Sequence, residues 1–403
     1  MQTARRQFVI VGGGQAGGWA ARTLRERGFS GRIVLVGQEA HPPYERPPLS
    51  KELLVSGKPS SSSYLWSSEK LKDLEIDFHC ASSAAAIDRS RHELRLQDGR
   101  RIPYDRLLLA TGARPRRLAL PGTDLPGIHY LRTIEDCLTI RQALASAERL
   151  LVVGGGWIGL EVAAAAVTLG VPVTLVEATD QLCGRSLPKQ SATYFLDLHT
   201  ARGVDVRLGA KLVSLKGPEV VERAVFADGS SLRVSNVVVG IGVEPNVELA
   251  VECGLSVDNG IVVDETTRTS DPDIFAAGDV ASQPVDVVGP RHRLESWQNA
   301  QNQGIAAAKA MLDEESRHRE LPWFWSDQFD LNFQLLGIPD RSDRIFVKGD
   351  PCTGRFVQFF VANQRINAVA AFNSPRELRE AKRLMLGKLP FDASSLSTSA
   401  VVQ

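Results

Sequence analysis

The chain lacks an excess of charge of either sign, and it lacks an apolar run long enough to cross a membrane. Its 403 residues carry 47 basic and 47 acidic side chains, so the formal net charge is zero. A nucleic acid or an anionic membrane surface attracts a basic field, so neither is expected as the main partner. The most apolar stretch, residues 162–176, is broken by Gly170 and Pro172, which excludes a membrane span there.

Paired cysteines are also missing. The five cysteines form no Cys-x-x-Cys pair and no Cys/His spacing typical of a metal site, which excludes a redox disulfide and a zinc or iron–sulfur centre. An odd, scattered set is typical of reduced thiols in a cytosol. The N-terminus leads directly into a predicted strand and leaves no room for a secretory signal. We therefore expect a cytoplasmic protein without metal, of about two to four domains.

Two glycine-rich units are present instead, each in the order strand, glycines, helix, strand. Their hydrophobic periodicity predicts a βαβ fold twice in one chain. The predicted elements are strand 8–11, helix 20–27 and strand 33–36, then strand 150–153, helix 158–169 and strand 173–176.

Each unit carries a GxGxxG motif between its first strand and its helix. The first glycine permits a tight turn, the second lets the backbone approach a pyrophosphate, and the third lets the helix pack on the strand. The helix N-terminus adds free N–H groups and partial positive charge. The repetition predicts two dinucleotide sites, with glycines Gly12, Gly14 and Gly17 in the first and Gly154, Gly156 and Gly159 in the second.

An acid at the end of the second strand usually binds the adenosine ribose. Glu177 stands 18 residues after Gly159, and no arginine for a 2′-phosphate follows it directly, which favours NADH over NADPH. In the first unit Gln38 and Glu39 are both candidates for this contact, and the sequence does not choose between them.

The remaining pattern predicts hairpins with turns at residues 98–99 and 228–229, a linker over residues 115–122, and strands at 107–110, 236–240 and 274–280. A helix over residues 296–312 follows. Alternating strands from residue 323 and a helix over 375–386 form a C-terminal domain, and residues 394–403 are expected to be a loose tail.

Several motifs in chain order resemble those of the two-dinucleotide flavoprotein reductases, and within them the NADH-dependent ferredoxin reductases of bacterial oxygenase systems. The motifs are PYERPPLSKELL (43–54), ATGARPR (110–116), LRTIED (131–136), GGGWIGLEVA (154–163), TSDPDIFAAGDVA (269–281) and PWFWSDQ (322–328). The resemblance implies an α/β fold of two Rossmann-like domains, similar to glutathione reductase, plus a C-terminal α+β domain. It assigns residues 1–114 and 245–318 to FAD, 115–244 to NADH, and 319–403 to the flavin and ferredoxin face.

Three charged residues gain a role from this resemblance. Asp279 ends a predicted strand where the next helix begins and is expected to hydrogen-bond the FAD ribitol, although an ordinary N-cap has the same pattern. Lys51 follows Ser50, a plausible N-cap, and a cation at a helix N-terminus is disfavoured by about 0.3–1 kcal/mol. The resemblance places Lys51 beside the flavin ring, paired with Glu161 in the first turn of the second nucleotide helix. A solvated lysine and simple dipole complementarity are the alternatives.

By matching position, the resemblance also assigns contacts with FAD to a further group, in which Ala84 contributes only its backbone. Trp323 and Trp325 share one strand face and either shield the flavin, carry docking or fill the core of a small domain. The further residues assigned to FAD are Ala16, Ala84, Ala110, Thr111, Gly112, Arg132, Gly278 and Trp297, and Ile158 is assigned to NADH.

The implied activity is hydride transfer from NADH to FAD and delivery of single electrons to a 2Fe–2S ferredoxin, which feeds a haem-thiolate monooxygenase or a ring-hydroxylating dioxygenase. A disulfide reductase needs a cysteine beside the flavin, and residues 42–54 contain none. A rubredoxin or other NADH-dependent acceptor reductase differs only in its acceptor. A redox sensor similar to apoptosis-inducing factor is disfavoured by the zero net charge.

An acidic ferredoxin calls for a basic face near the flavin. Residues 321–403 carry a slight excess of basic side chains, which permits such a patch and equally permits solvated charges. The candidates are Arg341, Arg344, Lys348, Lys382 and Arg383. A monomer is expected.

Overall fold

The computed structural model describes residues 6–59, 63–285, 289–318, 320–340, 342–387, 389, 391 and 400–402. The chain divides into two compact units, which we call unit 1 and unit 2. Unit 1 comprises Met1–Glu45, Ser60–Arg114 and Glu244–Pro322, and unit 2 comprises Arg46–Pro59, Pro115–Val243 and Trp323–Gln403. Two of the passages of the chain from one unit to the other lie within β8 (Ala113–Pro115) and β17 (Val243–Pro245).

Unit 1 is built on a five-stranded parallel sheet in the order β19-β7-β1-β2-β3. The central strand β1 is buried on both faces, as expected of a parallel strand covered by helices. Its strands are β1 (Gln7–Val11), β2 (Arg32–Val36), β3 (Ile76–His79), β7 (Arg106–Leu109) and β19 (Ile274–Ala276).

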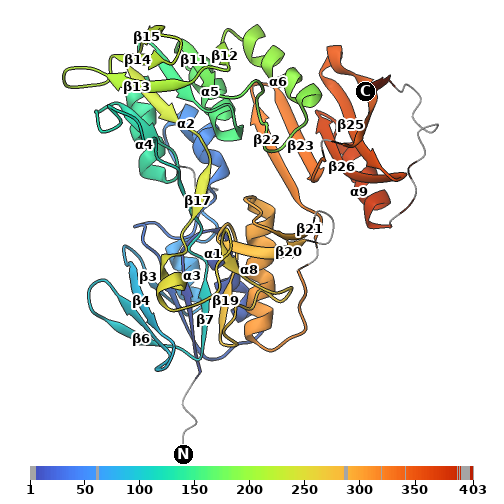
Figure 1. The fold of residues 1–403 in the computed structure, drawn as a ribbon. Coiled ribbons are helices and arrows are strands. Elements are labelled where there is room, and N and C mark those ends of the chain that lie inside the picture. The colour runs from blue at the N-terminus through green and yellow to red at the C-terminus, as the bar shows by residue number, and fades with distance from the viewer. Residues whose placement is uncertain are drawn as a thin grey trace, which may run out of the picture. The chain divides into compact units, whose positions relative to one another are not determined.

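Helices α1 (Gln15–Glu26) and α8 (Trp297–Met311) lie side by side in unit 1 (Figure 1). Their close approach depends on Gly304, because a Cβ there would lie 2.3 Å from the Ala16 carbonyl oxygen. The remaining elements of unit 1 are α3 (Ser68–Asp73), α7 (Glu248–Glu252), the antiparallel sheet β4 (Ala84–Asp88), β5 (Glu93–Leu96) and β6 (Arg101–Pro103), and the sheet β18 (Ile261–Val262), β20 (Ala281–Val285) and β21 (Gly289–His292).

Unit 2 repeats the parallel sheet, in the order β12-β11-β10-β16-β9. Its strands are β9 (Ile128–Tyr130), β10 (Leu150–Val153), β11 (Val173–Glu177), β12 (Asp205–Leu208) and β16 (Asn236–Val239). It also contains the 3-10 helix η1 (Pro47–Ser50), the helices α2 (Glu52–Ser56), α4 (Ile134–Leu144), α5 (Trp157–Thr168) and α6 (Lys189–Ala201), and the antiparallel sheet β13 (Leu212–Lys216), β14 (Arg223–Phe226) and β15 (Ser231–Arg233).

The C-terminal part of unit 2 is a six-stranded antiparallel sheet in the order β22-β23-β26-β25-β24-β27, with helix α9 packed on β26 (Figure 1). A cluster of phenylalanines fills this region, and Phe356 and Phe372 stack with their ring centroids 4.1 Å apart. Its elements are β22 (Trp323–Gln328), β23 (Leu331–Gly337), β24 (Arg344–Asp350), η3 (Pro351–Thr353), β25 (Arg355–Ala362), β26 (Arg365–Phe372), α9 (Pro375–Leu386) and β27 (Ala400–Val402).

These elements confirm the predicted fold class and correct two local expectations. The end of the chain is not loose throughout, because Ala400–Val402 pair antiparallel with β24, whose second edge is otherwise open; residues 392–399 and 403 lie outside the described part. Asp279 does not precede a helix. It lies in the turn from β19 to β20, and α8 is capped by Ser296, whose side chain accepts a hydrogen bond from the Asn299 N–H.

Candidate functional site

The first glycine cradle (Gly12, Gly14 and Gly17) lies between β1 and α1 in unit 1. Gly12 has φ +120°, and a Cβ on it would lie 2.1 Å from the Ala110 carbonyl oxygen. A Cβ on Gly17 would lie 1.9 Å from the Gly12 carbonyl oxygen, so only glycine permits this helix to start so close to the strand. A Cβ on Gly14, in contrast, would meet no described atom within 4 Å. Space for a ligand therefore opens at the second glycine.

The second glycine cradle (Gly154, Gly156 and Gly159) repeats this geometry in unit 2. Gly154 has φ +108°, and its Cβ would lie 2.4 Å from the Gly240 carbonyl oxygen. The second glycine is again open, since a Cβ on Gly156 would meet only that same oxygen, at 3.9 Å, among the described atoms.

The helices that follow the two cradles both begin without a side-chain cap. Gly14 is the N-cap of α1 and Gly156 the N-cap of α5, and within the described chain neither first turn contains an acidic residue. The first N–H groups of each helix are thus available to an anion. In addition, both polar side-chain atoms of Gln15, the first residue of α1, are buried without a hydrogen-bond partner among the described residues. The donors and the open glycines together fit a dinucleotide pyrophosphate at both places.

The strand next to each cradle ends in a matching three-residue segment. In unit 1 this is Ala110, Thr111 and Gly112 after β7, where the Thr111 hydroxyl donates to the Asn246 carbonyl oxygen at 2.8 Å. Strand register puts residues 240–242 after β16 in the equivalent place, and Ile241 is 38% exposed. Ile158, in the first turn of α5, is 45% exposed and adds a second uncovered apolar side chain to this unit. Our sequence reasoning missed residues 240–242; aligning VVVGIG with LLLATG would have found them.

The ribose acids differ between the cradles. Glu177 ends β11, and its carboxylate accepts hydrogen bonds from the Gly155 N–H at 2.8 Å and the Thr179 N–H at 2.9 Å. This places the acid against the glycine loop, as the sequence predicts. In unit 1 the register gives the same position to Gly37. Gln38 is exposed, whereas Glu39 is half-buried and accepts a hydrogen bond from the Tyr44 hydroxyl.

The turn at Gly278 and Asp279 is supported by a buried amide network in unit 1. Gln303, which is fully buried, accepts a hydrogen bond from the Gly278 N–H at 2.8 Å. Asn299 donates to Gln303 at 3.3 Å and contacts the His318 ring at 3.0 Å. Burial lowers the pKa of His318 to about 4, so this imidazole is neutral at neutral pH. The network holds the turn that contains Asp279.

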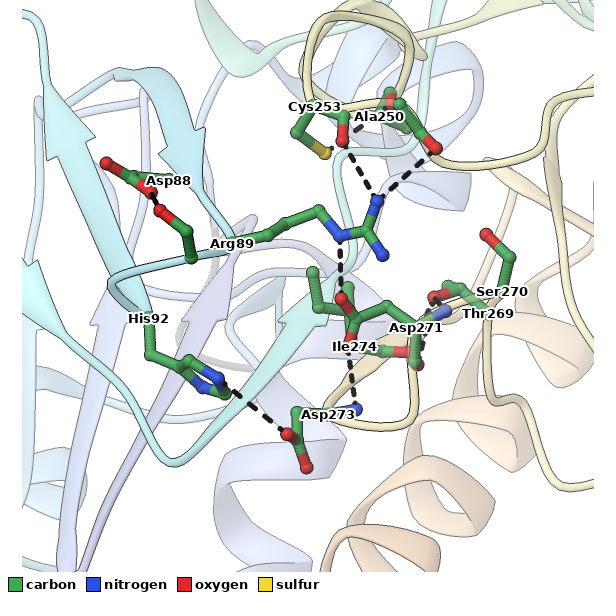
Figure 2. Close-up of polar contacts among 12 residues, drawn as sticks. Asp88, Arg89, His92, Ala250, Cys253, Thr269, Ser270, Asp271, Asp273 and Ile274 are labelled. Carbon is green, nitrogen blue, oxygen red and sulfur yellow. Dashed lines mark hydrogen bonds and ion pairs between the residues drawn. The ribbon is translucent and has the colours of Figure 1, made fainter.

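A second network anchors the segment before that turn (Figure 2). Arg89 donates to the Asp271 carboxylate at 2.6 Å and to the Cys253 carbonyl oxygen at 3.3 Å. Asp271 also accepts from the Asp273 N–H at 2.9 Å. Figure 2 shows that Arg89 lies in the turn between β4 and β5, and that its guanidinium extends to the loop before β19 and to the C-terminal end of α7. The polar residues of the TSDPDIF motif thus serve structure, and they hold the start of β19, the strand that precedes the turn at Gly278.

Lys51 and Glu161 form the ion pair that the resemblance implies. Their Nζ and Oε2 atoms are 2.7 Å apart, and the exposed fractions of the side chains are 14% and 3%. The local prediction was wrong in two respects. Ser50 is the last residue of η1 and donates to Glu161 at 2.5 Å instead of capping a helix. Glu161 lies beyond the first turn of α5, which weakens an explanation by the helix dipole alone.

The other residues assigned to the flavin lie in both units. In unit 1, Ala16 is buried in α1, Ala84 begins β4 and half-buried Trp297 begins α8. In unit 2, half-buried Arg132 precedes α4, and its carbonyl oxygen accepts a hydrogen bond from Arg46.

The C-terminal sheet and helix α9 contain the tryptophans and four described basic candidates. Trp323 and Trp325 stack on one face of β22, with centroids 5.2 Å apart, and both are half-buried. Arg344 and Lys348 lie on β24, while Lys382 and Arg383 lie on α9. Arg341 is outside the described residues.

The described part of the chain lacks a membrane-spanning helix and a cluster of metal-binding side chains. No helix there is long and apolar enough to cross a membrane. Its His, Cys, Asp and Glu side chains form no group of three or more that could hold a metal ion.

Comparison with known proteins gives matches over nearly the whole chain. Residues 6–304 match the family described as pyridine nucleotide-disulphide oxidoreductase, and residues 323–401 match the family described as reductase C-terminal. Rhodocoxin reductase of Rhodococcus erythropolis is 42% identical over 384 residues, which cover 95% of this chain and 90% of that protein.

Two further matches support the same relationship. The ferredoxin–NAD(+) reductase component of the anthranilate 1,2-dioxygenase system of Burkholderia cepacia is 39% identical over 98% of this chain and 97% of its own. The crystal structure of the covalent putidaredoxin reductase–putidaredoxin complex superposes with a TM-score of 0.94 at 36% identity, covering 98% of this chain and 96% of that chain.

Proposed function

The chain belongs to the pyridine nucleotide-disulphide oxidoreductase family, among its ferredoxin–NAD(+) reductases, and we propose that FAD is its resident cofactor. In the proposed reaction NADH is oxidised, and the electrons leave singly to a 2Fe–2S ferredoxin that serves a monooxygenase or dioxygenase. Bound FAD supplies the chemistry, since it accepts a hydride and releases electrons one at a time. We infer a cytoplasmic location, where NADH is available.

The observation that carries this proposal is the duplicated cradle. Both cradles leave the second glycine open and both are followed by a helix with free N–H groups. One dinucleotide alone does not require two such places. We assign the FAD pyrophosphate to the first cradle, within residues 1–114 and 245–318, and NADH to the second, within 115–244. We assign residues 319–403 to the ferredoxin side.

In unit 1, the protein's task is to bind and orient. The Gly278 loop, held by Gln303, presents Asp279, whose carboxylate suits the hydroxyls of the ribitol chain. The N–H groups at the start of α1 suit the pyrophosphate. We propose that Ala110, Thr111 and Gly112 line the same cradle, and that Glu39 or Gln38 contacts the ribose.

In unit 2, Glu177 is proposed to accept hydrogen bonds from both ribose hydroxyls of NADH. A carboxylate there repels a 2′-phosphate, which supports NADH over NADPH. Ile158 and Ile241, both exposed, offer apolar surface beside the same cradle.

Lys51 is proposed to lie beside the flavin ring, where its ammonium group favours negative charge on the reduced cofactor. Glu161 holds that ammonium group, with the Lys51 Nζ and Glu161 Oε2 atoms 2.7 Å apart.

The test is to purify the protein, identify any released flavin by mass, and follow NADH and NADPH oxidation with ferricyanide and with a 2Fe–2S ferredoxin as acceptors. We expect FAD, a marked preference for NADH and rapid reduction of the ferredoxin. A colourless protein that rejects added FAD and leaves NADH untouched would contradict the proposal. Slow turnover with a long-lived charge-transfer band would favour a redox sensor, and reduction of rubredoxin alone would change the acceptor.

A further inference from the structure

A line of buried polar side chains runs from the Lys51–Glu161 pair into the C-terminal sheet of unit 2. Ser326, on β22, donates to Glu161 Oε1 at 2.6 Å. Gln328, two residues along the strand, donates to Ser326 Oγ at 2.9 Å, and its Oε1 lies 2.8 Å from His199 Nε2 on α6. The exposed fractions of Ser326, Gln328 and His199 are 0%, 1% and 0%. We call Ser326, Gln328 and His199 the buried relay.

The hydrogen bonds of the buried relay have one consistent direction. An ionised Glu161 only accepts, so the Ser326 hydroxyl proton points to it. Ser326 Oγ must then accept from the Gln328 amide nitrogen, which leaves the amide oxygen facing His199. That oxygen only accepts, so His199 carries its proton on Nε2. Every bond therefore donates toward the Glu161 carboxylate, and bonds in series strengthen one another in a low dielectric.

The side chains of the buried relay are polar, although apolar side chains could fill the same buried positions. Burying polar side chains is unfavourable unless each is satisfied, and apolar residues of similar volume commonly pack at least as well. One group remains unsatisfied here, because His199 Nδ1 is buried without a hydrogen-bond partner among the described residues. Burial also lowers the pKa of His199, which keeps the ring neutral and able to hold one tautomer. The arrangement is specific in a way that simple packing does not require.

We propose that Ser326, oriented by Gln328 and His199, is a positioning residue that stabilises the Glu161 carboxylate and so sets the charge of the Lys51–Glu161 pair at the flavin. This inference rests on the proposed function for the flavin and goes beyond it, since it makes β22 part of the redox site. Glu161 thus accepts from Lys51 and Ser50 on one oxygen and from Ser326 on the other.

Other charged or titratable groups lie on the elements packed around Glu161. Glu52 is exposed on α2, and Glu177 ends β11, where its carboxylate is bonded to the glycine loop. Cys183 is buried, and its thiol pKa is raised by burial and by the charges of Glu161 and Glu177. Asp327 follows Ser326 on β22 and accepts from Trp325 at 3.0 Å and Asn332 at 2.7 Å. These other groups are unchanged in the Ser326 variants, so a difference between those variants reports on the hydroxyl.

The first test compares Ser326→Ala with Ser326→Thr, which keeps the hydroxyl, and with Ser191→Ala as a matched control. Ser191 is also fully buried, lies on α6 with His199, and its hydroxyl has no partner among the described residues. The readout is the ratio of the rate constants for flavin reduction by NADH at about pH 6 and about pH 8 in anaerobic rapid mixing.

Loss of the hydroxyl removes the hydrogen bond that Glu161 Oε1 accepts from Ser326, and hydrogen bonds to charged groups are among the stronger ones in proteins. We expect the rate ratio of Ser326→Ala to change by about threefold or more, because the charge of the Lys51–Glu161 pair is then no longer stabilised by this hydrogen bond. The ratios of Ser326→Thr and Ser191→Ala should equal the wild-type value. A wild-type ratio in Ser326→Ala overturns the inference, whatever its thermal stability.

The second test does not depend on flavin reduction. Nitrogen-15 NMR of labelled histidines in the purified protein, with His199 identified by its loss in His199→Gln, should show at about pH 8 a neutral ring protonated at Nε2, with a pKa below the ordinary histidine value. The signal should move in Gln328→Leu. An Nδ1-protonated or freely titrating ring contradicts the buried relay. A protein that shows the expected histidine yet binds no flavin contradicts only the proposed function.

Discussion

The two glycine cradles share a backbone and differ in the residues at the ends of their strands. In both, a Cβ on the first glycine would collide with a carbonyl oxygen of the neighbouring strand, at 2.1 Å for Gly12 and 2.4 Å for Gly154. The position held by Glu177 in unit 2 is Gly37 in unit 1, and Thr111 corresponds to Ile241. The shared part suits any pyrophosphate, so the side chains at the strand ends must determine which nucleotide binds and how firmly.

The shared backbone predicts the largest effect. Gly12→Ala combines a strained φ of +120° with a backbone collision, so we expect the free energy of unfolding to fall by about 3 kcal/mol or more. Gly99→Ala is the control, because Gly99 has φ +89° and no described atom within 4 Å of its Cβ, and it should lose only about 1 kcal/mol. Urea unfolding measures the loss of unfolding free energy in both variants. Equal losses would show that the collision with the Ala110 carbonyl oxygen does not add to the effect of Gly12→Ala.

The open glycines should separate the two nucleotides. Gly14→Ala and Gly156→Ala leave folding nearly unchanged, since the added methyl meets open space. We expect Gly14→Ala to be purified largely without flavin, and Gly156→Ala to keep flavin while its KM for NADH rises at least about a hundredfold, from lost pyrophosphate contact. Visible absorbance and steady-state kinetics decide the outcome. If both variants lose the same nucleotide, the assignment of one cradle to each is wrong.

The partly buried His318 makes the stability of unit 1 depend on pH. Burial depresses the pKa of His318 from 6.5 to about 4, so the unfolded chain binds this proton more readily than the folded chain. The stabilisation is complete above about pH 6.5 and is lost as the pH falls toward 4, by about 1.4 kcal/mol per pH unit. His318→Gln should flatten the pH dependence of the unfolding free energy in that window. An unchanged slope would show that His318 is solvated.

The acid found in only one cradle should have a smaller, selective effect. Glu177→Gln keeps the shape and removes the charge, so we expect the KM for NADH to rise about tenfold, while the KM for NADPH stays level or falls. Asp180→Asn is the control, because Asp180 is an exposed neighbour paired with Lys189. If NADH and NADPH respond equally to Glu177→Gln, this carboxylate does not contact the ribose.

The smallest effect is expected at the Arg89–Asp271 ion pair, which is shown in Figure 2. The Arg89 side chain is 36% exposed, so its ion pair with Asp271 is partly screened, and we expect Arg89→Ala to lower the unfolding free energy by at most about 1 kcal/mol. Arg89→Lys should recover part of the loss. The flavin content should stay at the wild-type level in both. A large loss of flavin would give this anchor a direct role in the site.

Local patterns account well for the fold. The predicted helix over 375–386 and the strand over 150–153 are confirmed to the residue. The helix has a clear period after Pro375, and the strand is a short continuous apolar run that ends at a glycine. The strands β20 and β21 were missed, and with them the turn that carries Asp279. Strand β20, which follows Gly278, pairs with β18 and β21, and no sequence pattern near it predicts this pairing.

The sequence predicted those residues of the candidate site that can be recognised by their spacing along the chain. The glycines and Glu177 are of this kind, and their roles toward FAD and NADH stay predictions. The partners of Glu161 were only half predicted. Lys51 came from the resemblance. Ser326 lies in the PWFWSDQ motif, but it is 165 residues from Glu161 in the chain, and nothing in the motif predicts that contact.

By itself, the sequence determined that this protein repeats a βαβ unit with a phosphate cradle, because glycine spacing and hydrophobic period act over a few neighbouring residues. Only the tertiary structure decided which buried or partly buried groups meet: Thr111 with Asn246, Gln303 with Gly278, and Ser326 with Glu161. Such contacts join residues remote in the chain, and they form because a buried polar group must find a partner wherever packing brings one.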